Sequence, residues 1–126
     1  MYTAILRYVP NHPERLSAIF HALGDPTRRA VLERLALGPA AVSDLARPFS
    51  MALPSFTQHL TVLEGSGLVR SRKHGRVRTY ELRPLALTEV DTWLARQRTL
   101  WEKRLNQLDD YLLTLKQATT KENNKP

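Results

Sequence analysis

The sequence predicts a mainly α-helical fold with one small β-hairpin, in the order of a winged helix-turn-helix, followed by a long C-terminal helix. Three observations support this fold class. Apolar residues recur at steps of three and four through most of the chain, which is typical of amphipathic helices. The pattern changes over residues 68–82, where two short runs flank His74-Gly75. A helical pattern then continues from residue 85 to about residue 116.

The first two helices are indicated by residues that suit helix ends. Pro13 fits a first helical turn, and an apolar face follows it. That face consists of Leu16, Ile19, Phe20 and Leu23. Asp25-Pro26 predicts the start of a second helix, because aspartate accepts hydrogen bonds from the unpaired N–H groups there. Gly38-Pro39 predicts its end.

The central segment predicts a helix-turn-helix and a wing. We expect a short helix over residues 42–47, a turn over residues 48–52 and a helix over residues 53–64. The runs 68–73 and 76–82 around a two-residue turn with glycine predict a hairpin, with Tyr80 and Leu82 facing inward. We therefore expect one domain over residues 13–116, with a dimerisation helix over 85–116, an N-terminal arm over 1–12 and a disordered polar tail over 117–126.

The charge balance favours a polyanionic partner. The 126 residues include 19 Lys and Arg against 12 Asp and Glu, a net charge of +7 with a pI near 10.2. Nucleic acid is the first candidate, an anionic membrane surface is the second, and a merely solvated basic surface is the third. The absence of cysteine excludes disulfides, zinc–thiolate sites and thiol nucleophiles. With no signal peptide or apolar run of about 20 residues, we expect a cytoplasmic protein.

The helix over residues 53–64 has the character of a DNA recognition helix. At 100° per residue its core side consists of Leu53, Phe56, Leu60 and Leu63. Its outward side consists of Pro54, Thr57, Gln58 and Thr61, with Ser55 at its edge, and we expect these five residues to contact DNA. No carboxylate precedes Glu64, and short hydroxyl and amide side chains suit the major groove. A plain surface helix is the alternative, but such helices usually carry Lys–Glu pairs. We interpret His59, at the border, as a packing residue rather than a DNA contact.

The hairpin has more cations than a turn requires. We expect Arg72, Lys73, Arg76 and Arg78 to contact the phosphate backbone of DNA. A solvated hairpin without a partner is the less favoured alternative. A single acidic residue, Glu81, lies in this region.

The apolar face of the long C-terminal helix is wider than a domain of this size can bury. We expect a second copy of the chain to cover this face. The resulting dimer should recognise a DNA site with two half-sites. The expected dimerisation residues are Leu87, Val90, Leu94, Trp101, Leu108 and Leu112. Packing against the helix's own chain is the alternative, and we expect it for part of the helix.

No pattern of residues predicts catalysis, a cofactor or a metal site. The four histidines are scattered, no Gly-rich phosphate loop occurs, and adjacent Asp109 and Asp110 point in different directions. We therefore expect no enzymatic activity, no cofactor and no bound metal.

Residues 16–116 resemble the ArsR family of bacterial winged-helix repressors. The first motif is Ala22-Leu23-Gly24-Asp25-Pro26-Thr27-Arg28-Arg29 with Val31-Leu32 and Leu35. The second is Ser55-Phe56-Thr57-Gln58-His59-Leu60 with Val62-Leu63-Glu64 and Gly67-Leu68-Val69. The third is Gly75-Arg76-Val77-Arg78-Thr79-Tyr80-Glu81-Leu82.

The resemblance implies a homodimeric repressor that contacts DNA through the helix around residues 54–61 and through the wing. Metal-sensing members of the family carry two cysteines in the third helix, where this sequence has Ala41 and Ser43. The long helix also lacks the Asp and His ligands of other sensors. Together with the run from Trp93 to Arg98 and Trp101-Glu102, this resembles a metal-independent branch.

Three classes of function remain open at this point. A DNA-binding transcriptional repressor is the leading hypothesis. A winged-helix protein–protein module and a peripheral membrane protein are the alternatives. DNA binding should weaken steeply with salt, whereas a protein module need not show that dependence, and liposome binding would identify a membrane protein.

Overall fold

The computed structural model describes residues 13–123. The expected arm over residues 1–12 and the last three residues of the expected tail lie outside the described part. The chain divides after Val90 into two compact units.

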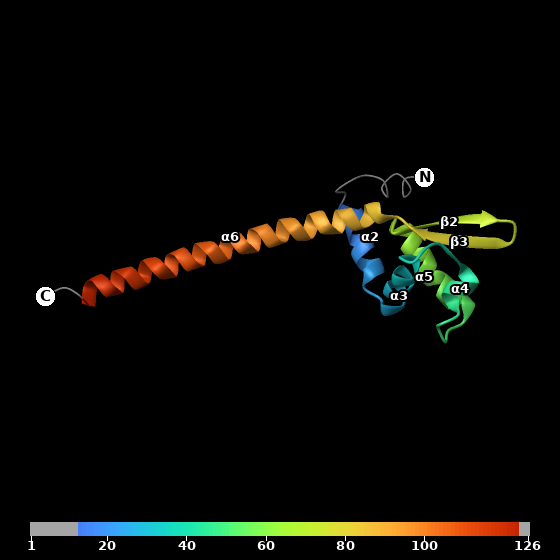
Figure 1. Cartoon of the computed structure of the whole chain (residues 1–126), viewed down its shortest axis with the longest axis horizontal. Coiled ribbons are helices and arrows are strands. Elements are labelled where there is room, and N and C mark those ends of the chain that lie inside the picture. Colours follow the sequence, from blue (N-terminus) through green and yellow to red (C-terminus); the bar gives the residue numbers. More distant parts are fainter. Residues whose placement is uncertain (1–12, 124–126) are drawn as a thin grey trace. The chain divides into compact units, whose positions relative to one another are not determined.

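The order of the elements is that of a winged helix-turn-helix (Figure 1). The elements are α2 (Pro13–Leu23), α3 (Pro26–Leu35), β1 (Ala40–Ala41), α4 (Val42–Ala46), α5 (Leu53–Gly65), β2 (Val69–His74), β3 (Val77–Leu82) and α6 (Pro84–Asn123). The predicted fold class is therefore confirmed. The predicted ends of the helices and of the hairpin agree with these bounds to within a few residues, apart from the end of α6.

The sheet has three antiparallel strands in the order β1-β3-β2, one strand more than the sequence predicted. β1 pairs Ala40 with Tyr80 and Ala41 with Thr79. A strand of two alanines has no alternation of apolar and polar residues, so its pattern could not reveal it. β2 and β3 form the predicted hairpin, and Gly75 at its turn has a φ of 60°, a backbone conformation that glycine adopts without strain.

The core of the first unit lies between the helices and the sheet. Phe56, Leu60 and Leu63 of α5 are fully buried, as predicted for its core side. They pack with Ile19, Ala22, Val31, Leu35, Ala40, Leu45, Leu68, Val69, Tyr80, Ala86 and Val90. Leu53 differs from the prediction, since it is 57% exposed. It is the first residue of α5 and lies nearly one turn before Phe56, beyond the end of the buried cluster.

A buried ion pair fixes α2 against the start of α6. The Nε of Arg15 donates to both carboxylate oxygens of Glu89, at 2.7 and 2.8 Å. The Arg15 side chain is only 4% exposed, and one of its two terminal nitrogens, Nη1, is buried without a hydrogen-bond partner. Gly67 makes room for it, since a Cβ there would meet the guanidinium at 3.4 Å, and the φ of Gly67 is 83°.

The second unit is the helical segment from Asp91 to Asn123. The expectation of a disordered tail from residue 117 is wrong for residues 117–123, which continue α6. This stretch contains good helix formers but almost no apolar residue, so its pattern did not predict a packed helix. All side chains from Arg98 to Asn123 are exposed.

Candidate DNA-binding surface

α4, the following turn and α5 form the helix-turn-helix. Pro54 lies in the first turn of α5, where its missing N–H breaks no hydrogen bond. Phe49 in the turn packs against Phe56 of α5, with ring centroids 5.4 Å apart. Phe49 and Met51 are partly buried against the core. These contacts hold α5 by its apolar side and turn its opposite side to solvent.

The outward side of α5 is polar and uncharged. The five predicted contact residues Pro54, Ser55, Thr57, Gln58 and Thr61 are all exposed there. The first turn has no acidic residue, and the preceding residue, Ala52, provides no capping side chain. The positive end of the helix dipole and its unpaired N–H groups are therefore open to an anion such as a phosphate. The structure thus brings all five residues to one surface.

A polar cluster of Asp25, Arg28 and His59 connects α5 to the corner between α2 and α3. The Nε of Arg28 donates to the carbonyl of Ala22 at 2.8 Å, and its Nη2 donates to the carbonyl of His21 at 2.9 Å. The Nη1 of Arg28 lies 3.1 Å from Nδ1 of His59, and Nδ1 of His59 lies 3.7 Å from Oδ2 of Asp25. His59 is half-buried in this cluster, in keeping with a structural role.

The sequence predicts Asp25 only as the cap of the second helix. It does cap α3, since it accepts from the N–H of Arg28 at 3.1 Å. This backbone hydrogen bond lowers the pKa of Asp25, and the nearby His59 and Arg28 side chains act in the same direction. Arg28 was missed as a positioning residue, because nothing in the pattern relates it to a histidine 31 positions away.

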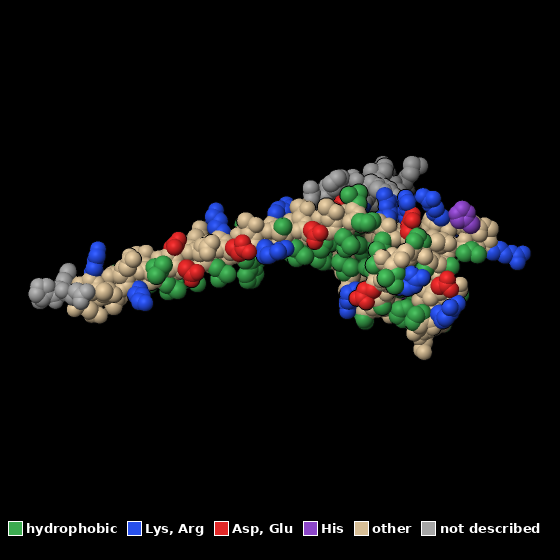
Figure 2. All heavy atoms as spheres, viewed as in Figure 1, with side chains coloured by type: hydrophobic (Ala, Val, Ile, Leu, Met, Phe, Trp, Pro, Cys, Tyr) green, Lys and Arg blue, Asp and Glu red, His purple; other side chains and the backbone are tan. Residues whose placement is uncertain are grey.

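The wing distributes its cations over two faces and a turn. In the hairpin register Arg72 lies opposite Thr79, and Lys73 lies opposite Arg78. Because successive side chains alternate between faces, Lys73 and Arg78 share one face, Arg72 occupies the other, and Arg76 lies in the turn. Lys and Arg side chains gather around this hairpin (Figure 2). All four predicted contact residues are exposed.

A chain of hydrogen bonds connects the wing to the last turn of α5. The guanidinium nitrogen Nη1 of Arg78 donates to the hydroxyl of Ser71 at 2.8 Å. Ser71 donates to Oε1 of Glu64 at 2.8 Å. Tyr80 lies beside this chain: burial raises the pKa of its hydroxyl, and the negative charge of Glu64 adds to the shift. Arg78 is thereby held on the face of the wing that continues toward the helix.

Not every cation of the hairpin is available to an anion. Arg70 forms an ion pair with Glu81 directly across the strands. Its charge is compensated within the chain, so it differs from the four predicted contact residues.

The predicted dimerisation residues fall into two groups. Leu87, Leu94, Trp101, Leu108 and Leu112 are exposed, with Trp101 at 70%. Val90 is 8% exposed and belongs to the core of its own chain. We therefore leave Val90 out of the candidate dimer surface: its side chain is turned toward its own sheet and helices rather than toward solvent.

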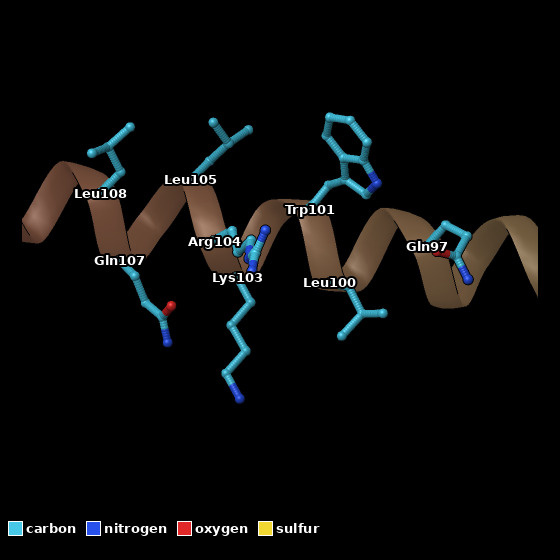
Figure 3. A pocket seen from close by; sticks show the side chains of 8 residues that line it. All are labelled: Gln97, Leu100, Trp101, Lys103, Arg104, Leu105, Gln107 and Leu108. Carbon is cyan, nitrogen blue, oxygen red and sulfur yellow. The ribbon is translucent and has the colours of Figure 1, made fainter.

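In the view of Figure 2, apolar side chains of α6 gather along one edge of the helix. Trp101, Leu105 and Leu108 point to the same side, whereas Leu100, Lys103 and Gln107 point to the other (Figure 3). Gln97 and Arg104 lie between these two rows, and the eight residues together border one open face of a single helix (Figure 3). Such a surface has the form of an interface rather than of an enclosed ligand cavity.

Neither a cluster of metal ligands nor a membrane-spanning helix occurs in residues 13–123. In residues 13–123 no group of three or more His, Asp or Glu side chains is placed to hold a metal ion. None of the helices over the same residues combines the length and apolar character needed to cross a bilayer.

The comparisons with known proteins agree with this geometry. A family model described as a helix-turn-helix domain matches residues 23–72, from the end of α2 into β2. A helix-turn-helix type transcriptional regulator of Mycobacterium tuberculosis is 44% identical over 86 residues, which are 68% of this chain and 78% of that protein.

Two solved structures extend the comparison beyond the helix-turn-helix segment. A crystal structure of an ArsR family transcriptional regulator is 56% identical, with a TM-score of 0.71, and the match covers 75% of this chain and 97% of that one. A solution structure of a homodimeric winged helix-turn-helix DNA-binding domain from Mycobacterium bovis, described as a possible ArsR-family regulator, is 25% identical with a TM-score of 0.54. That match covers 69% of this chain and 82% of the other.

Proposed function

The chain belongs to the ArsR family of winged helix-turn-helix transcriptional regulators, and we propose that it is a repressor that binds specific DNA sequences as a homodimer. In this proposal α5 enters the major groove with Pro54, Ser55, Thr57, Gln58 and Thr61. The wing lies on the phosphate backbone with Arg72, Lys73, Arg76 and Arg78.

The observation that carries the proposal is the division of chemistry between two connected elements. α5 presents neutral groups that can form hydrogen bonds with base edges without repelling phosphate. The wing presents cations that can replace the counterions of the backbone. The hydrogen bonds from Arg78 through Ser71 to Glu64 support their joint action.

The homodimer is supported by the exposed apolar side of α6. Large side chains such as Trp101 and Leu108 are more than half exposed along it, which is costly in water and typical of an interface. The solution structure of the Mycobacterium bovis domain, a homodimer by its description, adds support. A twofold dimer carries two copies of α5, which suits a DNA site with two half-sites.

Repression, cytoplasmic location and the lack of an enzymatic role are further parts of the proposal. The family resemblance supports repression, in which a dimer that covers promoter DNA excludes RNA polymerase. A protein that regulates transcription acts where the chromosome lies, hence in the cytoplasm. Its family is a class of regulators that act by binding, so we propose no reaction, cofactor or metal for it.

The test is fluorescence anisotropy with the full chain and labelled DNA from upstream of its own gene. Unrelated DNA of equal length is the control, and both are titrated at two salt concentrations. Tight and salt-sensitive binding to the upstream DNA, with much weaker binding to the control, supports a specific regulator. No binding to either DNA at low salt would overturn the proposal in favour of a protein–protein module.

Two variants separate the proposed roles of helix and wing. Arg76→Ala should weaken binding to all duplexes by a similar factor and reduce the salt dependence, because phosphate contacts are independent of sequence. Gln58→Ala should instead reduce the preference for particular bases. Equal effects of both variants on every duplex would contradict this division.

A further inference from the structure

We propose that α5 recognises thymine through its C5-methyl group, using the side-chain methyl groups of Thr57 and Thr61. This inference rests on the proposed function and deepens it, because it states which base class the DNA-binding surface selects.

The hydrogen bonds of the two threonines carry the argument. The hydroxyl of Thr57 donates to the carbonyl of Leu53 at 2.9 Å, and the hydroxyl of Thr61 donates to the carbonyl of Thr57 at 3.0 Å. Each hydroxyl hydrogen is thus used within the helix, and the hydroxyl keeps only its acceptor capacity for an external partner. Both side chains are exposed, so their methyl groups are the apolar parts presented to the groove.

The positions of the two threonines on α5 align their methyl groups along one side of the helix. Pro54, Thr57 and Thr61 are spaced by three and four residues and follow one ridge of the helix. This ridge offers a proline ring and two methyl groups, but no charge and no hydrogen-bond donor that is free to bind a base. Thr57 and Thr61 lie about 6 Å apart along the helix axis, since a helix rises about 1.5 Å per residue. Bases on one strand are about 3.4 Å apart, so the two methyl groups can reach thymines within about two base-pair steps.

The neighbouring ridge points to the same kind of base pair. Ser55 and Gln58 are three residues apart and lie beside the threonine ridge. A glutamine amide can form two hydrogen bonds with the N6 and N7 atoms of adenine, and a threonine methyl contacts the methyl group of thymine in the major groove. Adenine pairs with thymine, so both ridges of α5 select A·T pairs in the half-site.

The experiment uses deoxyuridine, which differs from thymidine only by the lack of the C5-methyl group. The full chain first selects duplexes from a random pool, and the tightest one is then synthesised with each thymidine replaced singly by deoxyuridine. Fluorescence anisotropy gives the Kd of each duplex. We expect one or two of the replacements in each half-site to raise the Kd about three- to fivefold, the loss expected for one buried methyl contact.

Two variants of Thr57 separate the methyl group from the hydroxyl. Thr57→Val retains a methyl at the same place and removes the hydroxyl, whereas Thr57→Ser does the reverse. Thr57→Val should still distinguish thymidine from deoxyuridine at the sensitive position, and Thr57→Ser should bind both duplexes equally. Circular dichroism of both variants checks that α5 is intact.

The outcomes separate this inference from the proposed function. If a duplex is selected but every deoxyuridine replacement leaves the Kd unchanged, methyl recognition is refuted and sequence-specific binding stands. Methyl recognition would also be refuted if Thr57→Ser still distinguished thymidine from deoxyuridine and Thr57→Val did not. That result would assign the contact to the hydroxyl. If no duplex is enriched, the proposed function fails and this inference fails with it.

Discussion

Replacing Lys73 by threonine should make the protein more stable and a weaker DNA binder at the same time. Lys73 lies directly opposite Arg78 in the antiparallel hairpin, and both side chains are exposed. Like charges in such a pair destabilise a sheet by up to about 1 kcal/mol, and threonine also suits a strand better than lysine. Lys73→Thr should therefore raise the Tm by a few degrees, since about 1 kcal/mol corresponds to roughly 4–8 °C in a small domain.

The effect on DNA binding should have the opposite sign. Each lost phosphate contact reduces the slope of log K against log salt by about 0.9, so a dimer with two altered wings loses about 1.8. Between 50 and 200 mM salt that slope change corresponds to a factor of roughly 12 in relative affinity. Anisotropy over a salt series measures the slope, and thermal unfolding measures the Tm.

A matched control is Lys121→Thr, which removes the same charge from an exposed position on α6. It should leave both the slope and the Tm nearly unchanged. The reasoning is refuted if Lys73→Thr leaves the salt slope at its wild-type value. It is also refuted if this variant lowers the Tm, because the charge pair would then be neutral or favourable.

Three further predictions concern the fold, the dimer and the pH dependence. Glu89→Gln should lower the free energy of unfolding by about 3–5 kcal/mol in urea titrations, because it leaves the buried Arg15 charge uncompensated. The double variant Arg15→Met/Glu89→Leu should lose far less stability, since it leaves no buried charge. Equal losses of stability in the two variants would contradict this reasoning. Leu108→Asp should shift the molecular mass in sedimentation equilibrium from dimer to monomer and weaken DNA binding, and an unchanged mass would remove Leu108 from the interface. Asp25→Ala should lower stability by about 0.5–2 kcal/mol at pH 7 through loss of the cap on Arg28. Because the folded pKa of Asp25 is lowered below 3.8, this stabilisation is present above pH 3.8 and is lost as the pH falls through the folded pKa. The difference between wild type and Asp25→Ala in urea unfolding should therefore diminish below pH 3.8, and a constant difference would contradict the assignment.

The features that the sequence predicted correctly are those encoded by local patterns. The buried side of α5 follows from the spacing of Phe56, Leu60 and Leu63, which alone places the remaining residues outward. The hairpin follows from the glycine turn at Gly75 between two short runs. Both features depend on residues that are close together in the sequence, so they can be predicted without tertiary information.

The features that the sequence did not reveal depend on contacts between distant residues. Arg15 and Glu89 are 74 positions apart, and neither lies in a pattern that singles it out. Arg28 and His59 meet only because α2, α3 and α5 pack around one corner. Val90 belonged to a stripe of apolar residues that continues along α6, and only the tertiary structure shows that the core of its own chain buries this member.

The position of Glu64 explains how the two proposed DNA-binding elements can act together. A carboxylate in the last turn of a helix faces the negative end of the helix dipole, which is unfavourable by itself. Here the hydroxyl of Ser71 donates to it, and Arg78 donates to Ser71 and places a positive charge nearby. The arrangement offsets the charge of Glu64 and fixes β2 and β3 against the end of α5. A wing held in this way keeps its cations at a set distance from the outward side of α5. In the proposed complex with DNA, phosphate contacts of the wing would therefore set how deeply α5 enters the groove.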